Sequence, residues 1–91
     1  MLASEFRGKG VFAADMKVVG DVDDLVIDAQ GHTLTDLIVK LGKEPARRIF
    51  GKTFTLGATR VRIPVSAVDK IGDSIVLHFN VDQLEEHVQK L

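Results

Sequence analysis

The sequence predicts an all-β fold, a small barrel of about six strands with a short C-terminal α-helix. Turn-forming residues recur at short intervals, and the runs between them are rich in the strand-favouring residues Val, Ile, Leu and Thr. The clearest helical spacing lies at the end of the chain. The turn signals are Gly8, Gly10, Ala14-Asp15, Gly20, Gln30-Gly31, Gly42, Gly51, Gly57 and Gly72-Asp73.

The composition is that of one folded domain. The 91 residues suit a single small unit, with the barrel over about residues 3–79 and the helix over about 81–91. No apolar run reaches the roughly 18 residues that span a bilayer, and the N-terminus has no signal-peptide pattern. The absence of cysteine excludes disulfides and thiolate metal sites. We therefore expect a cytoplasmic protein without membrane insertion.

The first long element is a β-hairpin. The run V-D-D-L-V-I-D from Val22 is followed by A-Q-G-H and then by T-L-T-D-L-I-V-K-L. This pattern predicts two strands joined by a short turn, with Gly31 at a position of positive φ. In the second strand Leu37, Val39 and Leu41 share the face that points to the core.

The middle of the chain is less regular. Residues 44–51, EPARRIFG, predict a short helical turn with Pro45 at its first position and Gly51 at its end. Residues 66–71, SAVDKI, allow a single helical turn capped by Ser66. Runs that alternate between apolar and polar residues, before and after residues 66–71, predict the remaining strands of the barrel. The predicted core residues are Val11, Val22, Val26, Leu37, Val39, Phe54, Val61, Ile63, Ile75 and Leu77.

The tail, NVDQLEEHVQKL, predicts the C-terminal helix. Asn80 can cap it, with Gln83 at the capping-box spacing. An apolar stripe at helical spacing runs through Val81, Leu84, Val88 and Leu91. A helix this short needs a docking surface. We predict that the stripe and the open strand edges form a homodimer; the alternative is that the helix packs on its own barrel.

Four aspartates between Val18 and His32 raise the question of a metal or catalytic site. An EF-hand loop starting at Asp21 fails, because Leu25, Val26 and His32 stand where the loop needs an oxygen ligand, a glycine and a glutamate. We expect Asp21 and Asp23 on a solvated strand face and Asp28 in a turn. The three histidines, His32, His78 and His87, lack zinc-site spacing. The sequence therefore predicts no catalytic, cofactor or metal site, and no enzyme.

Charge is distributed unevenly along the chain. Residues 40–70 hold eight basic and two acidic side chains, whereas the remainder holds four basic and eleven acidic ones. Such asymmetry favours a surface polarised for a partner. Arginines with interleaved aromatics can also bind single-stranded RNA, but Phe50 and Phe54 can equally belong to the core. The candidate partner-binding residues are Arg47, Arg48, Phe50, Lys52, Arg60 and Arg62.

The ordered motifs of the chain resemble the PRC-barrel family, especially its short stand-alone archaeal members. The segments that carry the resemblance are SEFRGKGVFAAD, VVGDVDDLVIDAQGHTLTDLIV and RIPVSAVDKIGDSIVL. Gly20, Val22 and Asp24 match the G-x-V-x-D strand, and Gly31 matches the hairpin glycine. Members often carry Asp-Gly where this chain has Asp15-Met16, so we expect the first turn to differ in type.

The resemblance also implies a class of function. PRC barrels occur in the photosynthetic reaction-centre H subunit and in a ribosome-maturation factor, and small archaeal members are associated with the FtsZ ring and its SepF membrane anchor. These are adaptor or assembly roles without catalysis. The resemblance therefore implies a non-catalytic protein-interaction module of archaeal cell division. The alternative is a ribosome-maturation module that binds ribosomal protein or ribosomal RNA, and direct nucleic-acid binding is the less favoured reading.

Overall fold

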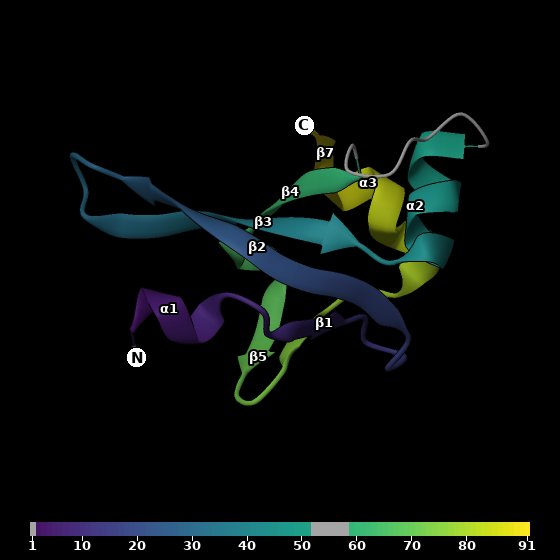
Figure 1. Ribbon diagram of the computed structural model, residues 1–91, viewed down its shortest axis with the longest axis horizontal. Coiled ribbons are helices and arrows are strands. Elements are labelled where there is room, and N and C mark those ends of the chain that lie inside the picture. The colour runs from purple at the N-terminus through teal and green to yellow at the C-terminus, as the bar shows by residue number, and fades with distance from the viewer. Residues whose placement is uncertain (1, 52–58) are drawn as a thin grey trace.

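The computed structural model describes residues 2–51 and 59–91 and shows one curled sheet. Seven strands follow the order β5-β6-β1-β2-β3-β4-β7 (Figure 1). All neighbours pair antiparallel except β1 and β6, which are parallel. The predicted all-β barrel is confirmed, as a half-barrel with one strand more than expected. The strands are β1 (Gly10–Phe12), β2 (Val18–Asp28), β3 (Thr33–Leu41), β4 (Arg60–Pro64), β5 (Val68–Ile71), β6 (Ile75–Leu77) and β7 (Gln89–Lys90).

Short helical segments connect and flank the strands. The α-helix α1 (Ala3–Phe6) precedes β1, and α2 (Lys43–Phe50) follows β3. The single turn η2 (Val65–Ala67) links β4 to β5, and η3 (Val81–Gln83) runs into α3 (Leu84–His87) near the C-terminus. The α2 helix and the η3–α3 segment lie side by side at one end of the sheet (Figure 1) and are joined by an ion pair between Arg48 and Asp82.

The predicted hairpin is confirmed as β2 and β3, with a β-bulge that changes its core face. Val22 pairs with Val39, but the next partner of β3, Ile38, faces Asp24, so Asp23 is an additional residue on β2. The bulge reverses the alternation beyond it. Leu25 therefore packs against the core, whereas Val26 is only half-buried, which corrects the prediction that Val26 is a core residue.

The turn at the hairpin tip differs from the prediction in one residue. His32, not Gly31, has the positive φ, at 56°. Asp28 forms the turn, since its Oδ1 accepts a hydrogen bond from the backbone N–H of Gln30 at 3.0 Å. A Cβ at Gly31 would lie 3.1 Å from Asp28 Oδ2, a tight contact that a small shift of the carboxylate would have to relieve.

The first turn, between β1 and β2, also contains a residue of positive φ. Met16 takes a φ of 66°, the left-handed region that glycine favours. The backbone N–H of Met16 donates to the Ala13 carbonyl, and the N–H of Ala13 donates to the Lys17 carbonyl. Met16 therefore takes a conformation suited to glycine and presents an exposed side chain at the tip.

Two helix starts lie elsewhere than predicted. The α2 helix begins at Lys43, two residues before Pro45, which is tolerated because first-turn residues have no helical partner for their N–H. It ends at Gly51, with φ 71°, as predicted. The turn η2 begins after Pro64, so Ser66 lies inside it and is not its cap.

The C-terminal helix is confirmed but is shorter than the predicted 81–91. It starts as expected, with Gln83 Oε1 accepting a hydrogen bond from the backbone N–H of Asn80 at 3.0 Å. It ends at His87, and Val88 is extended with φ −119° and ψ 155°. The next residues form β7 and pair with β4. The pairing of β7 with β4 provides hydrogen-bond partners for backbone groups on the edge of β4. Those groups would lack these partners if the helix continued to the end of the chain.

This shorter helix divides the predicted apolar stripe. Val81 and Leu84 are buried in the core of their own chain, and Val88 packs against that core. Leu91 is exposed and lies beyond β7. The stripe therefore does not form one continuous helical surface. Self-association of the chain stays a prediction.

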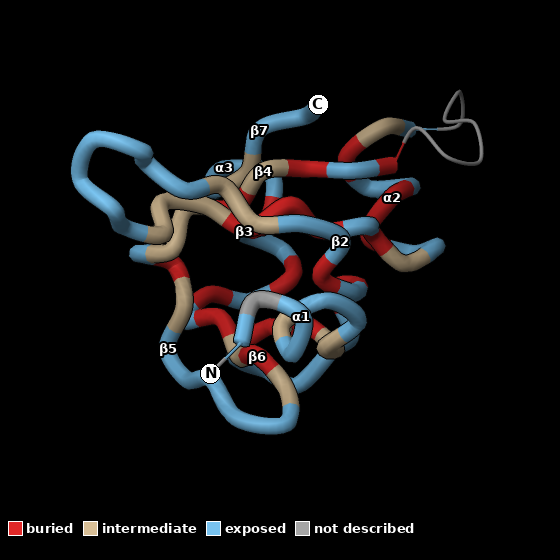
Figure 2. The backbone as a smooth tube through the Cα atoms, turned by 60° about the vertical axis from the view of Figure 1, so that its left-hand side comes forward, coloured by how far each residue is buried: buried red, intermediate tan, exposed pale blue. Residues whose placement is uncertain are grey.

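The core lies on the inner side of the curled sheet, where the buried segments of the strands and of α2 gather (Figure 2). The tip of the β2–β3 hairpin extends away from it and is exposed. Phe54 of the predicted core lies outside the described residues. The predicted core residues that are confirmed are Val11, Val22, Leu37, Val39, Val61, Ile63, Ile75 and Leu77.

Replacing Leu84 by aspartate should unfold the protein. Leu84 is 1% exposed, so L84D removes its apolar contacts and buries an unpaired carboxylate. We expect the free energy of unfolding to fall by at least about 4 kcal/mol, which is most of the stability of a small domain. Urea denaturation followed by circular dichroism measures it. The matched control is L91D, because Leu91 is 62% exposed; equal losses in the two variants would contradict the described packing.

Replacing Gly20 by alanine should strain the hairpin. A Cβ on Gly20 would collide with the backbone carbonyl oxygen of Lys40 on the neighbouring strand, and backbone cannot move aside as a side-chain end can. We expect G20A to cost about 1–3 kcal/mol of stability. G72A is the control, since a Cβ there meets no atom within 4 Å. A thermal melt of G20A equal to that of G72A would refute the close approach.

Candidate interaction surface

The outer face of β2, β3 and β4 carries the charged side chains. The strand register places Lys40 of β3 between Asp21 of β2 and Arg60 of β4. On the adjacent row, Ile38 lies between Asp24 and Arg62. Side chains directly opposite on one face of a sheet are close enough to interact. The face therefore has acidic residues on β2 and basic residues on β4, and we call it the outer charged face.

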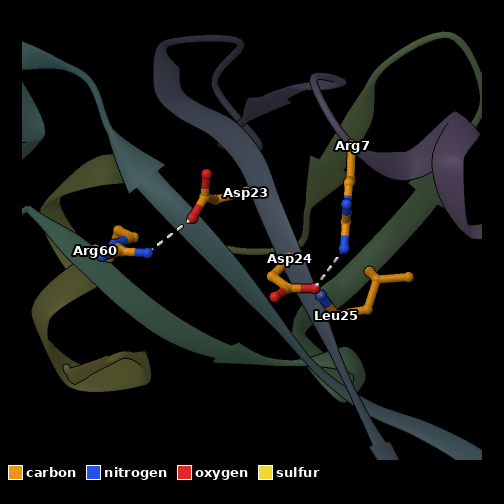
Figure 3. Close-up of polar contacts among 5 residues, drawn as sticks. All are labelled: Arg7, Asp23, Asp24, Leu25 and Arg60. Atoms are coloured by element: carbon orange, nitrogen blue, oxygen red, sulfur yellow. Dashed lines mark hydrogen bonds and ion pairs between the residues drawn. The ribbon is translucent and has the colours of Figure 1, made fainter.

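Ion pairs hold these charges in place (Figure 3). Arg60 Nη1 lies 3.1 Å from Asp23 Oδ2, so the bulge residue of β2 reaches over β3 to β4. Arg7 Nη2 lies 3.4 Å from Asp24 Oδ1 and ties the segment after α1 to β2. Both pairs are exposed, so each adds little stability. They place acidic and basic side chains next to one another on the outer charged face.

The surroundings change the titration of Asp24. Its Oδ1 accepts a hydrogen bond from the backbone N–H of Leu25 at 2.8 Å, and this bond lowers the pKa of Asp24 below its ordinary value. The positive charge and hydrogen bond of Arg7 lower the pKa further. A lowered pKa keeps the carboxylate ionised, which suits binding and ion pairing rather than proton transfer near neutral pH.

The outer charged face covers a buried isoleucine. Ile38 is buried but does not belong to the main core cluster on the inner side of the sheet. Asp24 and Arg62 flank it from the neighbouring strands. The Nε atom of Arg62 is buried and has no hydrogen-bond partner within residues 2–51 and 59–91. Arg62 lies opposite Ile38 in the register, where the aliphatic stem of a long side chain can cover an apolar neighbour.

The candidate partner-binding residues lie on two elements. Arg60 and Arg62 are on β4 and belong to the outer charged face. Arg47 and Arg48 lie on α2, where Arg48 Nη1 is 2.8 Å from Asp82 Oδ1. Phe50 packs against the core, as the core interpretation of the sequence expects, and Lys90 Nζ lies 5.5 Å from its ring centre. Lys52 lies outside the described residues.

The two histidines near the C-terminus contact the core through Phe79. The ring of His87 stacks on Phe79 with 4.4 Å between ring centres, and His78 meets the same ring edge-on at 6.0 Å. His78 Nε2 also donates a hydrogen bond to the Ser66 carbonyl at 2.9 Å. In the part of the chain that the structure describes, no three His, Asp or Glu residues come close enough together to bind a metal ion.

A groove that the sequence analysis missed lies at the start of α2. It has a volume of about 610 Å3 and is lined by residues 16–18, residues 42–45, Arg48 and Val81. We call it the α2 groove. The signal in the sequence was a pair of apolar residues, Met16 and Val18, on either side of Lys17. Alternation along a strand places Met16 and Val18 on the same face but does not say whether that face is buried or exposed. The sequence alone therefore did not show that both side chains are exposed.

The family of the chain follows from comparison with known proteins. The family model described as "PRC-barrel domain" matches residues 1–84. The chain belongs to the PRC-barrel family. The match includes Gly20 and the β2–β3 hairpin, so the close strand approach at Gly20 occurs within the family domain. None of the helices among the described residues is both long and apolar enough to cross a bilayer.

A solved structure shows the same fold. This PRC-barrel chain is similar to a protein of Pseudomonas aeruginosa that is described as the 16S ribosomal RNA processing protein RimM, with a TM-score of 0.57 and 15% sequence identity. The likeness covers 90% of this chain but only 45% of that protein, which is therefore about twice as long as the matched part. No curated protein sequence matches the chain.

The pKa of Asp24 provides a test of the site geometry. Because the folded pKa lies below the unfolded one, Asp24 contributes stability above its unfolded pKa and loses it as the pH falls through the folded pKa. In R7A the pKa should rise but stay below the ordinary value, because the Leu25 N–H bond remains. NMR titration of the carboxyl carbon measures both values. A complete return to the ordinary value in R7A would show that the backbone bond is not the main cause.

Proposed function

We propose that this PRC-barrel chain is a non-catalytic, cytoplasmic adaptor that binds a protein partner. The observation that carries the proposal is the outer charged face, where the strand register places acidic side chains of β2 and basic side chains of β3 and β4 in adjacent rows and Asp23 pairs with Arg60. A surface with charges of both signs in a set pattern favours a partner with the complementary pattern. The resemblance to small archaeal members makes a division protein, of the SepF and FtsZ machinery, the first candidate.

The second candidate is a ribosome-assembly module. It is supported by the structural likeness to the protein described as a ribosomal RNA processing protein, and by the basic residues of β4 and α2. Arg48 and Arg60 are already engaged with aspartates. An RNA phosphate would have to displace those aspartates to reach either arginine.

A pull-down from a native lysate of the source organism, at low and at high salt, separates the two candidates. Recovery of identified division proteins supports the adaptor. Ribosomal particles that are released steeply by salt support the alternative, because phosphate contacts depend on counterion release. We expect the double variant R47E/R60E to lower recovery of the true partner at least about tenfold, since it reverses two charges. K70E, on the edge strand β5, is the matched control. Undiminished recovery by R47E/R60E would contradict a role for these residues.

A further inference from the structure

The α2 groove exposes apolar side chains beside a buried apolar floor. Met16 and Val18 are both exposed and large, with Val18 57% exposed. Pro45 and Val81 are buried and line the same groove. Exposed apolar groups gathered in a concave site gain free energy when a second apolar group covers them. The volume of about 610 Å3 lies in the range of small ligand sites and accepts one or two side chains rather than a whole domain.

The rim of the α2 groove is basic. Lys17, Lys43 and Arg48 line it together with one acid, Glu44. Arg48 forms an ion pair with Asp82, with 2.8 Å between Arg48 Nη1 and Asp82 Oδ1. Lys17 forms a longer ion pair with Asp15, with 3.9 Å between Lys17 Nζ and Asp15 Oδ2. Among the described residues, Lys43 is the rim cation that no ion pair balances, so its charge favours an anionic group beside it in the groove.

The backbone at the start of α2 adds to this preference. Gly42 precedes the helix and has no side chain that could cap it. Within the described residues, the backbone N–H groups of Lys43 and Glu44 have no hydrogen-bond acceptor. Uncapped N–H groups in the first turn of a helix favour a negatively charged acceptor. These donors lie in the same groove as the apolar floor and the basic rim.

We propose that the α2 groove binds a short acidic peptide segment of the partner protein. An aliphatic or aromatic side chain of the peptide contacts Met16, Val18 and Val81, and a neighbouring carboxylate reaches the first turn of α2 and Lys43. This inference rests on the proposed adaptor function and names the part of the partner that is recognised. RNA phosphates and lipid headgroups match the charge of the groove, but the apolar side chains of Met16, Val18 and Val81 that line it favour a peptide side chain.

The test uses the full chain, labelled with 15N, and a short peptide in which one Phe is flanked by Asp residues. We expect titration to shift the amide signals of Val18, Lys43 and Glu44, with a Kd below about 1 mM. Peptides with Asn in place of Asp, or Ser in place of Phe, should bind at least about tenfold more weakly. The variants V18D and K43E should show the same loss. Their matched controls are I27D, because Ile27 is 60% exposed on the hairpin, and K70E.

Several outcomes would overturn the proposal. A single-stranded RNA or anionic vesicles that shift these amides as strongly as the peptide would identify a general anion surface. Equal affinity of the peptide for wild type, V18D and K43E would place binding elsewhere. If V18D and K43E recover the same identified partner from a lysate as wild type does, the groove is not the docking site although the adaptor function stands. Thermal melts of all four variants exclude loss of folding as the cause.

Discussion

The antiparallel pairing of β2 with β3 is the interaction on which the other elements depend. The two longest strands form this pair, and their neighbours β1 and β4 add to its two sides. The pairing requires glycine at position 20, because the backbone of β3 at Lys40 passes too close for a Cβ. The glycine at this one position therefore permits the pairing to which the other strands add, and several of those additions, such as β1 with β6 and β4 with β7, join segments far apart in the sequence.

The bulge at Asp23 links this pairing to the candidate surface. Without the additional residue, Val26 would lie on the same face of β2 as Val22 and point toward the core. With it, Leu25 takes that place and both Asp23 and Asp24 reach the outer side. Asp23 then pairs with Arg60 and Asp24 with Arg7, so one irregularity positions two ion pairs from three segments of the chain (Figure 3). The aspartates of β2 therefore form part of the outer charged face that we propose for a partner.

The C-terminal segment completes both the core and the α2 groove. Val81 and Leu84 fill the end of the core beside α2, and Asp82 holds Arg48 from the same turn. The chain then leaves the helix and pairs with β4 as β7. Because Val81 also lines the α2 groove, the packing of the tail shapes the surface that we propose for the peptide. The proposed docking site therefore depends on residues from the first turn, α2 and the tail.

The sequence by itself determined the fold class, the main hairpin, the turn at Asp28 and most of the core, because alternation and turn residues act over a few neighbours. It also placed the capping residues of the last helix correctly. Only the tertiary structure decided the bulge at Asp23, the change from helix to strand after His87, and the meeting of Met16, Lys43 and Val81 in one groove. These depend on backbone partners and side chains far away along the chain, and a local pattern does not contain that information.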